Sequence, residues 1–219
     1  NNVSGVTNGT TYYYKVSAVN SVGEGALSNE ASATPQPAPV PVAKSTPYSA
    51  DFDVREMRGF SDGVISADDI GEFIRQVAPS SPMLGEADIG SLFINAGVSN
   101  GVNTSFLVAT ATIEGLFGTA GWAASHPQAH NTMGWGVPSP GTPPNDINSA
   151  GNWGEMVQRV ADRIAHGPYY YQAGLYTVEQ IRGKYAGQPN SESVVAIMND
   201  LYAYAKIRKP TVFITSPLE

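Results

Sequence analysis

The chain has 219 residues and a formal net charge of −7, with 42% apolar and 14% charged residues. The acidic balance argues against binding to nucleic-acid phosphates. The sequence also lacks any apolar run of roughly 20 residues, which argues against membrane insertion. Because there is no cysteine, disulfide bonds and thiolate metal sites are excluded.

The first 35 residues predict β-structure. Aromatic and β-branched residues dominate 11–19, and a Gly-rich turn at 20–25 separates them from a second strand at 26–34. This segment resembles the last third of a fibronectin type III domain, with Tyr12 as its corner tyrosine. The residues that carry the resemblance are Asn8, Gly9, Thr10, Tyr12, Val16, Ala18, Asn20, Gly23, Ser28 and Pro35. An unrelated hairpin is the alternative. Since such a sandwich needs about 100 residues, we expect this sequence to be a piece of a longer modular chain.

A Pro-rich linker is predicted at 36–48, because alternating prolines favour extended polyproline geometry. A helical domain follows at 49–206, and an extended tail at 207–219. The first predicted helix starts at Ser66, which caps it together with Asp69. The other predicted helices are 85–96, 104–116, 153–166, a short one capped by Thr177 and Gln180, and 191–206.

The predicted fold class is therefore mainly α, with a long Gly/Pro-rich loop region at 117–152 in which a small hairpin would fit. The helix 104–116 is apolar nearly all round, so it should be buried, yet it carries one acid, Glu114. An ionised carboxylate loses hydration in such company, which favours the protonated form that a general acid needs. The alternative for Glu114 is a structural acid that pairs with a buried Arg or Lys. No basic residue lies between Arg75 and Arg159, so a local partner is missing and only a distant one is left open.

The segment around this acid resembles the bacterial glucosaminidase family (glycoside hydrolase family 73), whose members are peptidoglycan hydrolases with a lysozyme-like helical fold. The resemblance spans about 86–205. Its motifs are a helix ending on Glu114-Gly115, the Gly-rich run 116–120, the segment 130–136 in place of an Asn-Asn motif, Trp153 opening a helix, and the late segments 176–181 and 184–186. Three positions depart from the family pattern, namely Gly115, His130 and Met133, and these bear on fine specificity.

The resemblance implies hydrolysis of β-1,4 bonds in cell-wall glycan, of the endo-β-N-acetylglucosaminidase type, with Glu114 as the general acid. Glycosidases normally use a second carboxylate. Asp146 is the next acid along the chain, although Asn-Asp after prolines is also a common turn. The N-acetyl group of the substrate is the other option. We expect the nearly isosteric Glu114→Gln to abolish turnover and to leave the fold intact.

Tyr185 matches a tyrosine that lines the cleft in the family, and a core tyrosine between two helices is an equal alternative. The residues predicted to contact substrate are Asn131, Gly134, Trp135, Trp122, Phe117 and His130. Aromatic rings stack on sugars, but they also form cores. Trp122 and Trp135 are favoured for substrate contact because they lie in the loops beside Glu114.

No cofactor or metal is expected. His126 and His130 have the spacing of zinc ligands on a helix, but Pro127 weakens that option. The turn before Ser66 is similar to half of a calcium loop, but Arg58 and Phe60 would occupy its first ligand positions. The expected partner is the peptidoglycan glycan strand, and the expected protein is an extracellular or wall-associated monomer. Alternatives are a lytic transglycosylase, a muramidase, or a non-catalytic wall-binding module.

Overall fold

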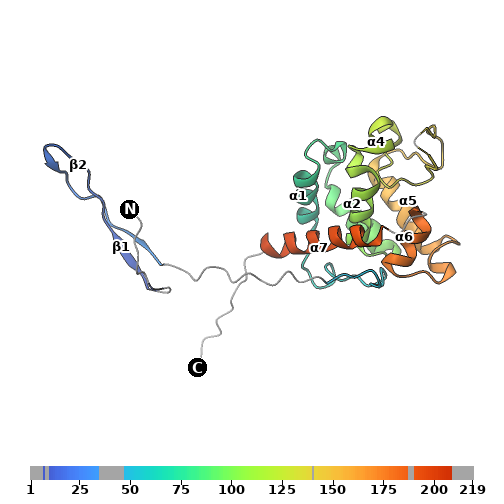
Figure 1. Cartoon of the computed structure of the whole chain (residues 1–219), viewed down its shortest axis with the longest axis horizontal. Helices are drawn as coiled ribbons and strands as arrows, with labels where there is room; N and C mark the ends of the chain where they lie inside the picture. The colour runs from blue at the N-terminus through green and yellow to red at the C-terminus, as the bar shows by residue number, and fades with distance from the viewer. Residues whose placement is uncertain (1–6, 8–9, 35–46, 140, 187–189, 209–219) are drawn as a thin grey trace, which may run out of the picture. The chain divides into compact units, whose positions relative to one another are not determined.

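The computed structural model describes residues 7, 10–34, 47–139, 141–186 and 190–208. The chain divides into two compact units, Asn1–Lys44 and Ser45–Glu219. The first contains short strands and the second is helical (Figure 1). The predicted mainly α class is confirmed.

In the first unit, β1 (Tyr12–Tyr14) pairs antiparallel with β4 (Ala31–Ala33), and β2 (Val19–Asn20) pairs with β3 (Gly23–Glu24). The predicted pair of strands joined by a turn is therefore present. The Asn20 side chain fixes the turn by accepting hydrogen bonds from two backbone N–H groups that follow it. Much of the apolar surface of this unit, including Val16, is exposed.

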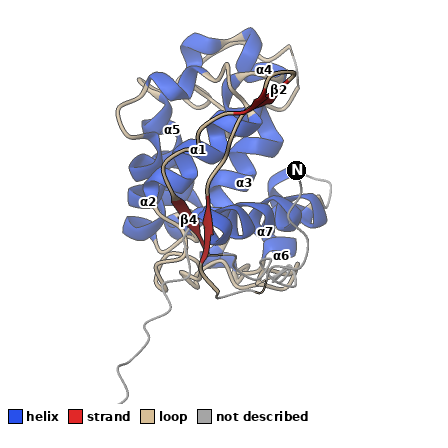
Figure 2. Ribbon diagram, turned by 90° about the vertical axis from the view of Figure 1, so that its left-hand side faces the viewer, coloured by secondary structure: helices blue, strands red, loops and turns tan. Residues whose placement is uncertain are grey.

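The second unit consists of α-helices and single-turn 3-10 helices, labelled η (Figure 2). Their bounds are α1 (Ala67–Val77), η1 (Pro82–Gly85), α2 (Ile89–Asn100), α3 (Thr104–Gly115), η2 (Leu116–Gly118), α4 (Gly121–Ser125), η3 (Pro127–Ala129), α5 (Trp153–His166), η4 (Tyr171–Ala173), α6 (Val178–Ala186) and α7 (Ser191–Arg208). None of these described helices combines the length and the apolar character that a membrane span requires.

Both predicted helix caps are present. Ser66 and Asp69 form a reciprocal capping box at the start of α1. Thr177 and Gln180 exchange the same two hydrogen bonds at the start of α6. Helix α5 has the predicted bounds, because its apolar residues recur at helical spacing until Gly167.

Several bounds differ from the prediction, among them the end of α3, which is Gly115 instead of Leu116. Helix α2 begins at Ile89 instead of Gly85, because Pro82 starts a separate 3-10 turn and Asp88 caps the helix. The first part of the predicted loop region 117–152 forms the short helices η2, α4 and η3, and its described residues from 130 onward are loop and turns without the small hairpin. Helix α7 continues through Arg208, so the first two residues of the expected tail are helical, and 209–219 lie outside the described residues. The linker falls mostly at 35–46, also outside them, whereas Tyr48 at its end is buried in the helical core.

Helix α3 is the centre of the core, as its apolar sequence predicts. It packs against α2 and α7, and α2 in turn packs against α1 and α5. Leu107, Val108 and Ala109 are completely buried. The α1–α2 contact requires a glycine, because a Cβ on Gly90 would lie 1.9 Å from the carbonyl oxygen of Ala67.

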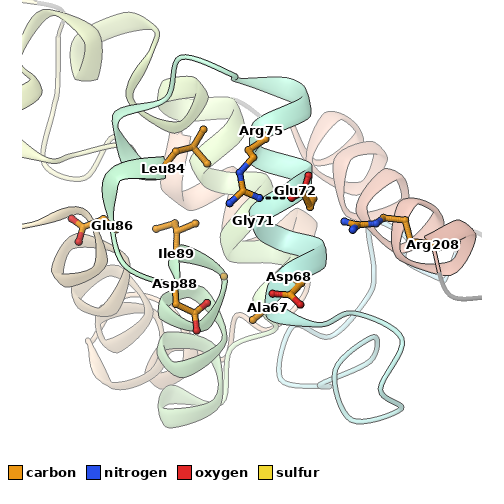
Figure 3. Close-up of a pocket in the computed structure, with 11 residues that line it drawn as sticks. Ala67, Asp68, Gly71, Glu72, Arg75, Leu84, Glu86, Asp88, Ile89 and Arg208 are labelled. Atoms are coloured by element: carbon orange, nitrogen blue, oxygen red, sulfur yellow. Dashed lines mark hydrogen bonds and ion pairs between the residues drawn. The ribbon is translucent and has the colours of Figure 1, made fainter.

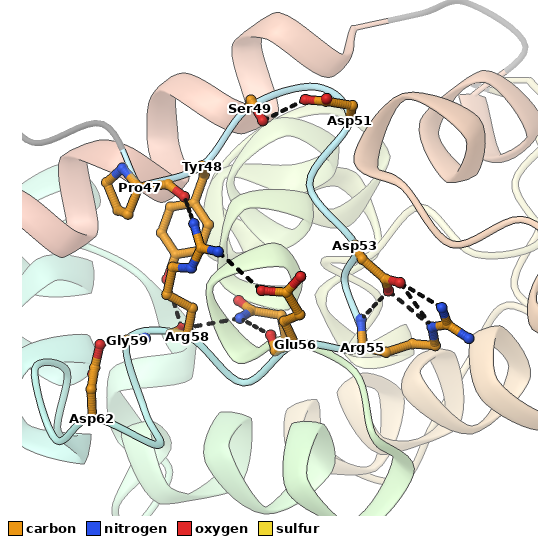
Figure 4. Close-up of polar contacts among 11 residues, drawn as sticks. Pro47, Tyr48, Ser49, Asp51, Asp53, Arg55, Glu56, Arg58, Gly59 and Asp62 are labelled. Atoms are coloured by element: carbon orange, nitrogen blue, oxygen red, sulfur yellow. Dashed lines mark hydrogen bonds and ion pairs between the residues drawn. The ribbon is translucent and has the colours of Figure 1, made fainter.

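The segment before α1 is fastened to the start of α3. The Asn103 side chain accepts from the backbone N–H of Ser105 at 2.9 Å and donates to the carbonyl oxygens of Glu56 and Arg58 at 2.7 and 3.1 Å. The Tyr48 hydroxyl donates to the Arg58 carbonyl at 2.8 Å, as Figure 4 shows. Burial raises the pKa of Tyr48 to about 12. We call Tyr48, Asn103 and Ser105 the α3 anchor.

Candidate active site

Glu114 lies in the last turn of α3, where the buried helix reaches the surface. Its side chain is 21% exposed. The chain then turns sharply, since Leu116 and Phe117 both have left-handed backbone conformations, with φ of +41° and +53°. Two consecutive residues with side chains rarely adopt this conformation, and such strain is common at functional sites.

A buried arginine from α6 supplies the distant partner that the structural alternative for Glu114 requires, although Glu114 itself is partly exposed. Arg182 is completely buried and donates from Nη2 to Glu114 Oε1. Its Nε donates to Asn190 Oδ1 at 2.9 Å, whereas Nη1 has no hydrogen-bond partner in the described part of the chain. The Glu114 carboxylate is therefore bound on its buried side by the Arg182 guanidinium, which is inaccessible to water. The expectation that Glu114→Gln leaves the fold intact must change, because Arg182 would then be buried without a counter-charge.

Arg182 is the main site residue that the sequence analysis missed. A signal was available, because Val178, Ile181, Arg182 and Tyr185 stand at positions i, i+3, i+4 and i+7 of one helix. These residues share the inward face of α6, and an arginine on such a face needs a buried acid. Glu114, the one acid of the most apolar helix, was the natural candidate.

Tyr185 lies against this ion pair. Its ring centre is 4.9 Å from the guanidinium carbon of Arg182, and its hydroxyl donates to the Met133 carbonyl at 2.5 Å. Burial, and after it the negative charge of Glu114, raise the pKa of Tyr185 well above its usual range. The phenol therefore stays protonated and acts as a hydrogen-bond donor. Tyr185 therefore packs between α6 and the loop that contains Met133, next to the Glu114–Arg182 ion pair.

The loop after η3 covers the other side of the carboxylate. Gly134 has φ of +66°, and a Cβ there would lie 2.6 Å from Glu114 Oε2. Only glycine fits this position. The Trp135 ring follows and lies 5.8 Å from the ring of Tyr185 and 6.5 Å from that of Tyr170. Of the residues predicted to contact substrate, Gly134 and Trp135 are thus the two that lie beside Glu114 and Tyr185.

Asn131 holds this loop in place. Its amide nitrogen donates to the carbonyl oxygens of Trp135 and Asn148 at 2.8 and 2.9 Å, and its amide oxygen accepts from the Trp135 N–H at 3.1 Å. Because these bonds occupy the buried side chain, Asn131 positions Trp135 and does not face a ligand.

Phe117 was predicted to contact substrate, and this is wrong. Its side chain is completely buried and packs edge-to-face against Phe93, with the ring centres 6.3 Å apart. The left-handed backbone at Phe117 turns the side chain into the core. The α3 sequence could not show this, because the direction of the chain changes only after Gly115.

Trp122 and His130 are half-buried and bonded to other loops. Trp122 stacks on His126 at 4.5 Å and donates to the Thr142 carbonyl at 2.6 Å. His130 Nδ1 pairs with the Ala150 carbonyl at 2.9 Å, and its ring lies edge-on to Trp153. No contact in the described residues joins either side chain to Glu114. Among those residues, no three His, Cys, Asp or Glu side chains gather as metal ligands.

Asp146 is exposed, and no hydrogen bond or ion pair among the described residues joins it to Glu114 or Arg182. It lines a shallow depression of about 390 Å³ together with Arg159, whose Nη1 donates to the Asp146 carbonyl at 3.1 Å. The preceding Asn145 accepts from the N–H groups of Ile147 and Asn148, which makes an Asx turn. These contacts favour the turn-forming role for this Asn-Asp pair over that of a second catalytic acid.

A larger hollow, of about 420 Å³, lies between α1, η1 and α2 (Figure 3). It is lined by several carboxylates, and Arg75 on its wall already pairs with Glu72. None of the predicted site residues lines it. Its polar groups belong to charged helix surfaces, which are usually solvated. The volume of this hollow alone therefore does not identify it as a functional site.

No protein-family model and no curated protein matches this chain. The geometry of the site and the order of the motifs around Glu114 are therefore the features that bear on function. The geometry gives one partly exposed carboxylate, a buried guanidinium behind it and aromatic rings beside it. Such a group can transfer a proton or stabilise positive charge on a bound molecule.

Proposed function

We propose that this protein is a peptidoglycan hydrolase with a lysozyme-like helical domain, which cleaves β-1,4 bonds of cell-wall glycan with Glu114 as its general acid. The observation that carries the proposal is the setting of Glu114. It stands at the end of the most buried helix, is open to solvent on one side and is held by Arg182 on the other. The order of the motifs around it supports the substrate class.

In the proposed reaction, Glu114 gives its proton to the glycosidic oxygen as the bond from that oxygen to the anomeric carbon breaks. Water then adds to the anomeric carbon, and its proton returns to Glu114. Since Oε1 is held by Arg182, Oε2 is the oxygen that meets the substrate. Arg182 would stabilise the carboxylate that remains after the proton has left. The setting of Asp146 favours the N-acetyl group of the sugar as the second participant.

The same ion pair supports a second role, in which Glu114 stays ionised and stabilises the positive charge that develops on the sugar. A guanidinium beside a carboxyl group stabilises its ionised form. Aryl glycosides with good leaving groups distinguish the two roles, because such groups depart without an acid. If Glu114→Gln retains activity on a nitrophenyl glycoside and loses it on natural glycan, Glu114 is the acid. Loss on both substrates indicates the charge-stabilising role.

Analysis of the reducing ends of digested peptidoglycan tests the proposal itself. The parent protein should release N-acetylglucosamine ends, and Glu114→Gln should lose about 10²–10⁴-fold in rate, the usual contribution of a general acid. Glu155→Gln is the matched control, because Glu155 also pairs with an arginine but lies on the exposed face of α5. Anhydro-muramic ends would instead identify a lytic transglycosylase, and intact glycan would identify a binding module.

Because Glu114→Gln disturbs a buried pair, its activity must be expressed per folded molecule. Circular dichroism at the assay temperature gives the folded fraction. A fully folded variant that digests glycan at the parent rate would remove Glu114 from the mechanism. Asp146→Asn completes the set, and we expect it to keep the parent rate.

We also propose that the first unit belongs to a fibronectin type III-like module and that the protein acts outside the cell as a monomer. The Tyr12 hydroxyl accepts a hydrogen bond at 2.8 Å from the backbone N–H of Thr7, five residues upstream. The corner tyrosine of such sandwiches makes a similar bond to upstream backbone. This bond lowers the pKa of Tyr12.

A further inference from the structure

A third hollow lies beside the loop of the candidate active site. It measures about 240 Å³ and is lined by Trp135, Ile147, Arg163, Gly167, Pro168 and Tyr169. We call it the Trp135–Tyr169 hollow. Its walls are mostly apolar, and two of them are large side chains left in solvent, since Ile147 is 64% and Tyr169 60% exposed. Exposed apolar and aromatic groups around a concave surface are typical of ligand sites.

The hollow shares a wall with the site of Glu114. Trp135 lines the hollow and directly follows Gly134, whose backbone touches the Glu114 carboxylate. The Trp135 ring also contacts Tyr185, which borders the ion pair. A molecule seated in the hollow would therefore continue a glycan bound at Glu114.

Two cations at or beside the hollow have no ion-pair partner in the described part of the chain, whereas the walls themselves are almost entirely apolar. Arg163 lines it and forms no hydrogen bond or ion pair through its guanidinium in those residues. The Lys184 ammonium lies 5.7 Å from the centre of the Tyr169 ring and likewise has no carboxylate partner there. By contrast, Arg75 and Arg159 each pair with a glutamate on their own helix. Because the chain has a net charge of −7, two neighbouring cations without carboxylate partners suggest an external anion as their partner.

The aromatic rings and the two cations together indicate which class of glycan would bind at the hollow. Polymers of N-acetylglucosamine alone are neutral, so they would use the rings and leave both cations without partners. The glycan of bacterial walls carries short peptides with free carboxylates, which a guanidinium binds by charge-assisted hydrogen bonds. We propose that the Trp135–Tyr169 hollow binds the acidic peptide branch of the wall glycan, with Arg163 as the carboxylate-binding residue. This inference rests on the proposed function and narrows its substrate to peptide-bearing strands.

The test compares Arg163→Gln with the parent on two substrates, intact glycan strands and the same strands after an amidase has removed their peptides. On intact strands kcat/KM should fall about tenfold, as expected for one charge-assisted hydrogen bond. On stripped strands it should not change. Arg75→Gln, at an arginine already paired on α1, is the control and should match the parent on both. An equal loss on both substrates, or no loss on either, would overturn the proposal.

Binding gives a readout that does not need catalysis. Titration calorimetry with soluble peptide-bearing glycan fragments should show about tenfold weaker binding to Arg163→Gln than to the parent, both measured at a temperature too low for turnover. If the parent binds these fragments through Arg163 but cleaves no glycan, the catalytic proposal fails and this inference stands. If the parent cleaves glycan but binds stripped and intact fragments equally, the catalytic proposal stands and this inference fails.

Discussion

The two ends of α3 are built in opposite ways. At its start, the α3 anchor is buried, and its side chains donate to two carbonyl groups: Asn103 to those of Glu56 and Arg58, and Tyr48 also to that of Arg58. Only the Thr104 hydroxyl beside them has no partner among the described residues of this end. At its end, Glu114 is partly exposed, and Arg182 keeps one buried nitrogen without a partner among the described residues. The chain there also turns through strained left-handed residues. One helix therefore has a stable end and a polar, strained end.

This difference shows how a small domain can support a charged group near its core. Fully bonded polar groups make an arrangement rigid, whereas incompletely bonded ones reduce stability and are kept where they serve function. Changes at the anchor should therefore alter stability and leave the activity per folded molecule intact. Changes at the Glu114 end should reduce activity more than their stability cost explains.

The largest effect on the free energy of unfolding should come from substitutions in the Glu114–Arg182 ion pair. The loss should differ between the two partners. Glu114→Gln leaves Arg182 charged and completely buried, which should cost about 3–5 kcal/mol. Arg182→Met should cost less, because the charge it leaves behind, on Glu114, still reaches water. The double variant should be more stable than Glu114→Gln alone. Urea unfolding at neutral pH measures all three, and equal costs for the two single variants would contradict a one-sided burial of the pair.

A smaller effect is expected from Tyr48 at high pH. Its pKa is about 12 in the fold and near 10.0 in the unfolded chain, so the unfolded state loses its proton first. The stabilisation is complete below pH 10 and should fall by about 2–3 kcal/mol as the pH rises toward 12. Tyr48→Phe should reduce this loss, as measured by urea unfolding between pH 8 and about 11.5, whereas Tyr13→Phe, at an exposed residue, should not. Neither variant should change activity per folded molecule at neutral pH.

The smallest stability effect is expected from two glycine substitutions, one beside Glu114 at the end of α3 and one just before the start of α3. Gly134→Ala puts a residue with a Cβ into a left-handed backbone conformation, which should lower the free energy of unfolding by about 1–2 kcal/mol. The new Cβ would also press against Glu114 Oε2. Gly101→Ala is matched to it, because Gly101 has φ of +63° but open space around it. Gly101→Ala should lose this amount of stability and keep its activity, whereas Gly134→Ala should lose at least as much stability and also lose hydrolysis of glycan. Equal activity in the two would mean that the carboxylate does not need its present position.

Several features followed from short stretches of sequence. Ser66 with Asp69, and Thr177 with Gln180, predict helix starts because both bonds of a capping box lie within four residues. The burial of α3 followed from its composition, and the isolation of Glu114 on it identified the residue to examine. Helix α2 was misplaced because Pro82 and Asp88 start two separate local structures where the apolar pattern suggested one.

The sequence by itself determined where the helices form, which of them is central and which acid stands out, since these depend on contacts between near neighbours in the chain. The tertiary structure alone decided that Arg182, 68 positions away, would hold Glu114, that Gly134 would lie against its carboxylate, and that Phe117 would enter the core. These features depend on how α3, α6 and the loop between them meet in space. The one-sided burial of the ion pair depends on the same arrangement, because it takes Arg182 out of water and leaves Glu114 partly exposed.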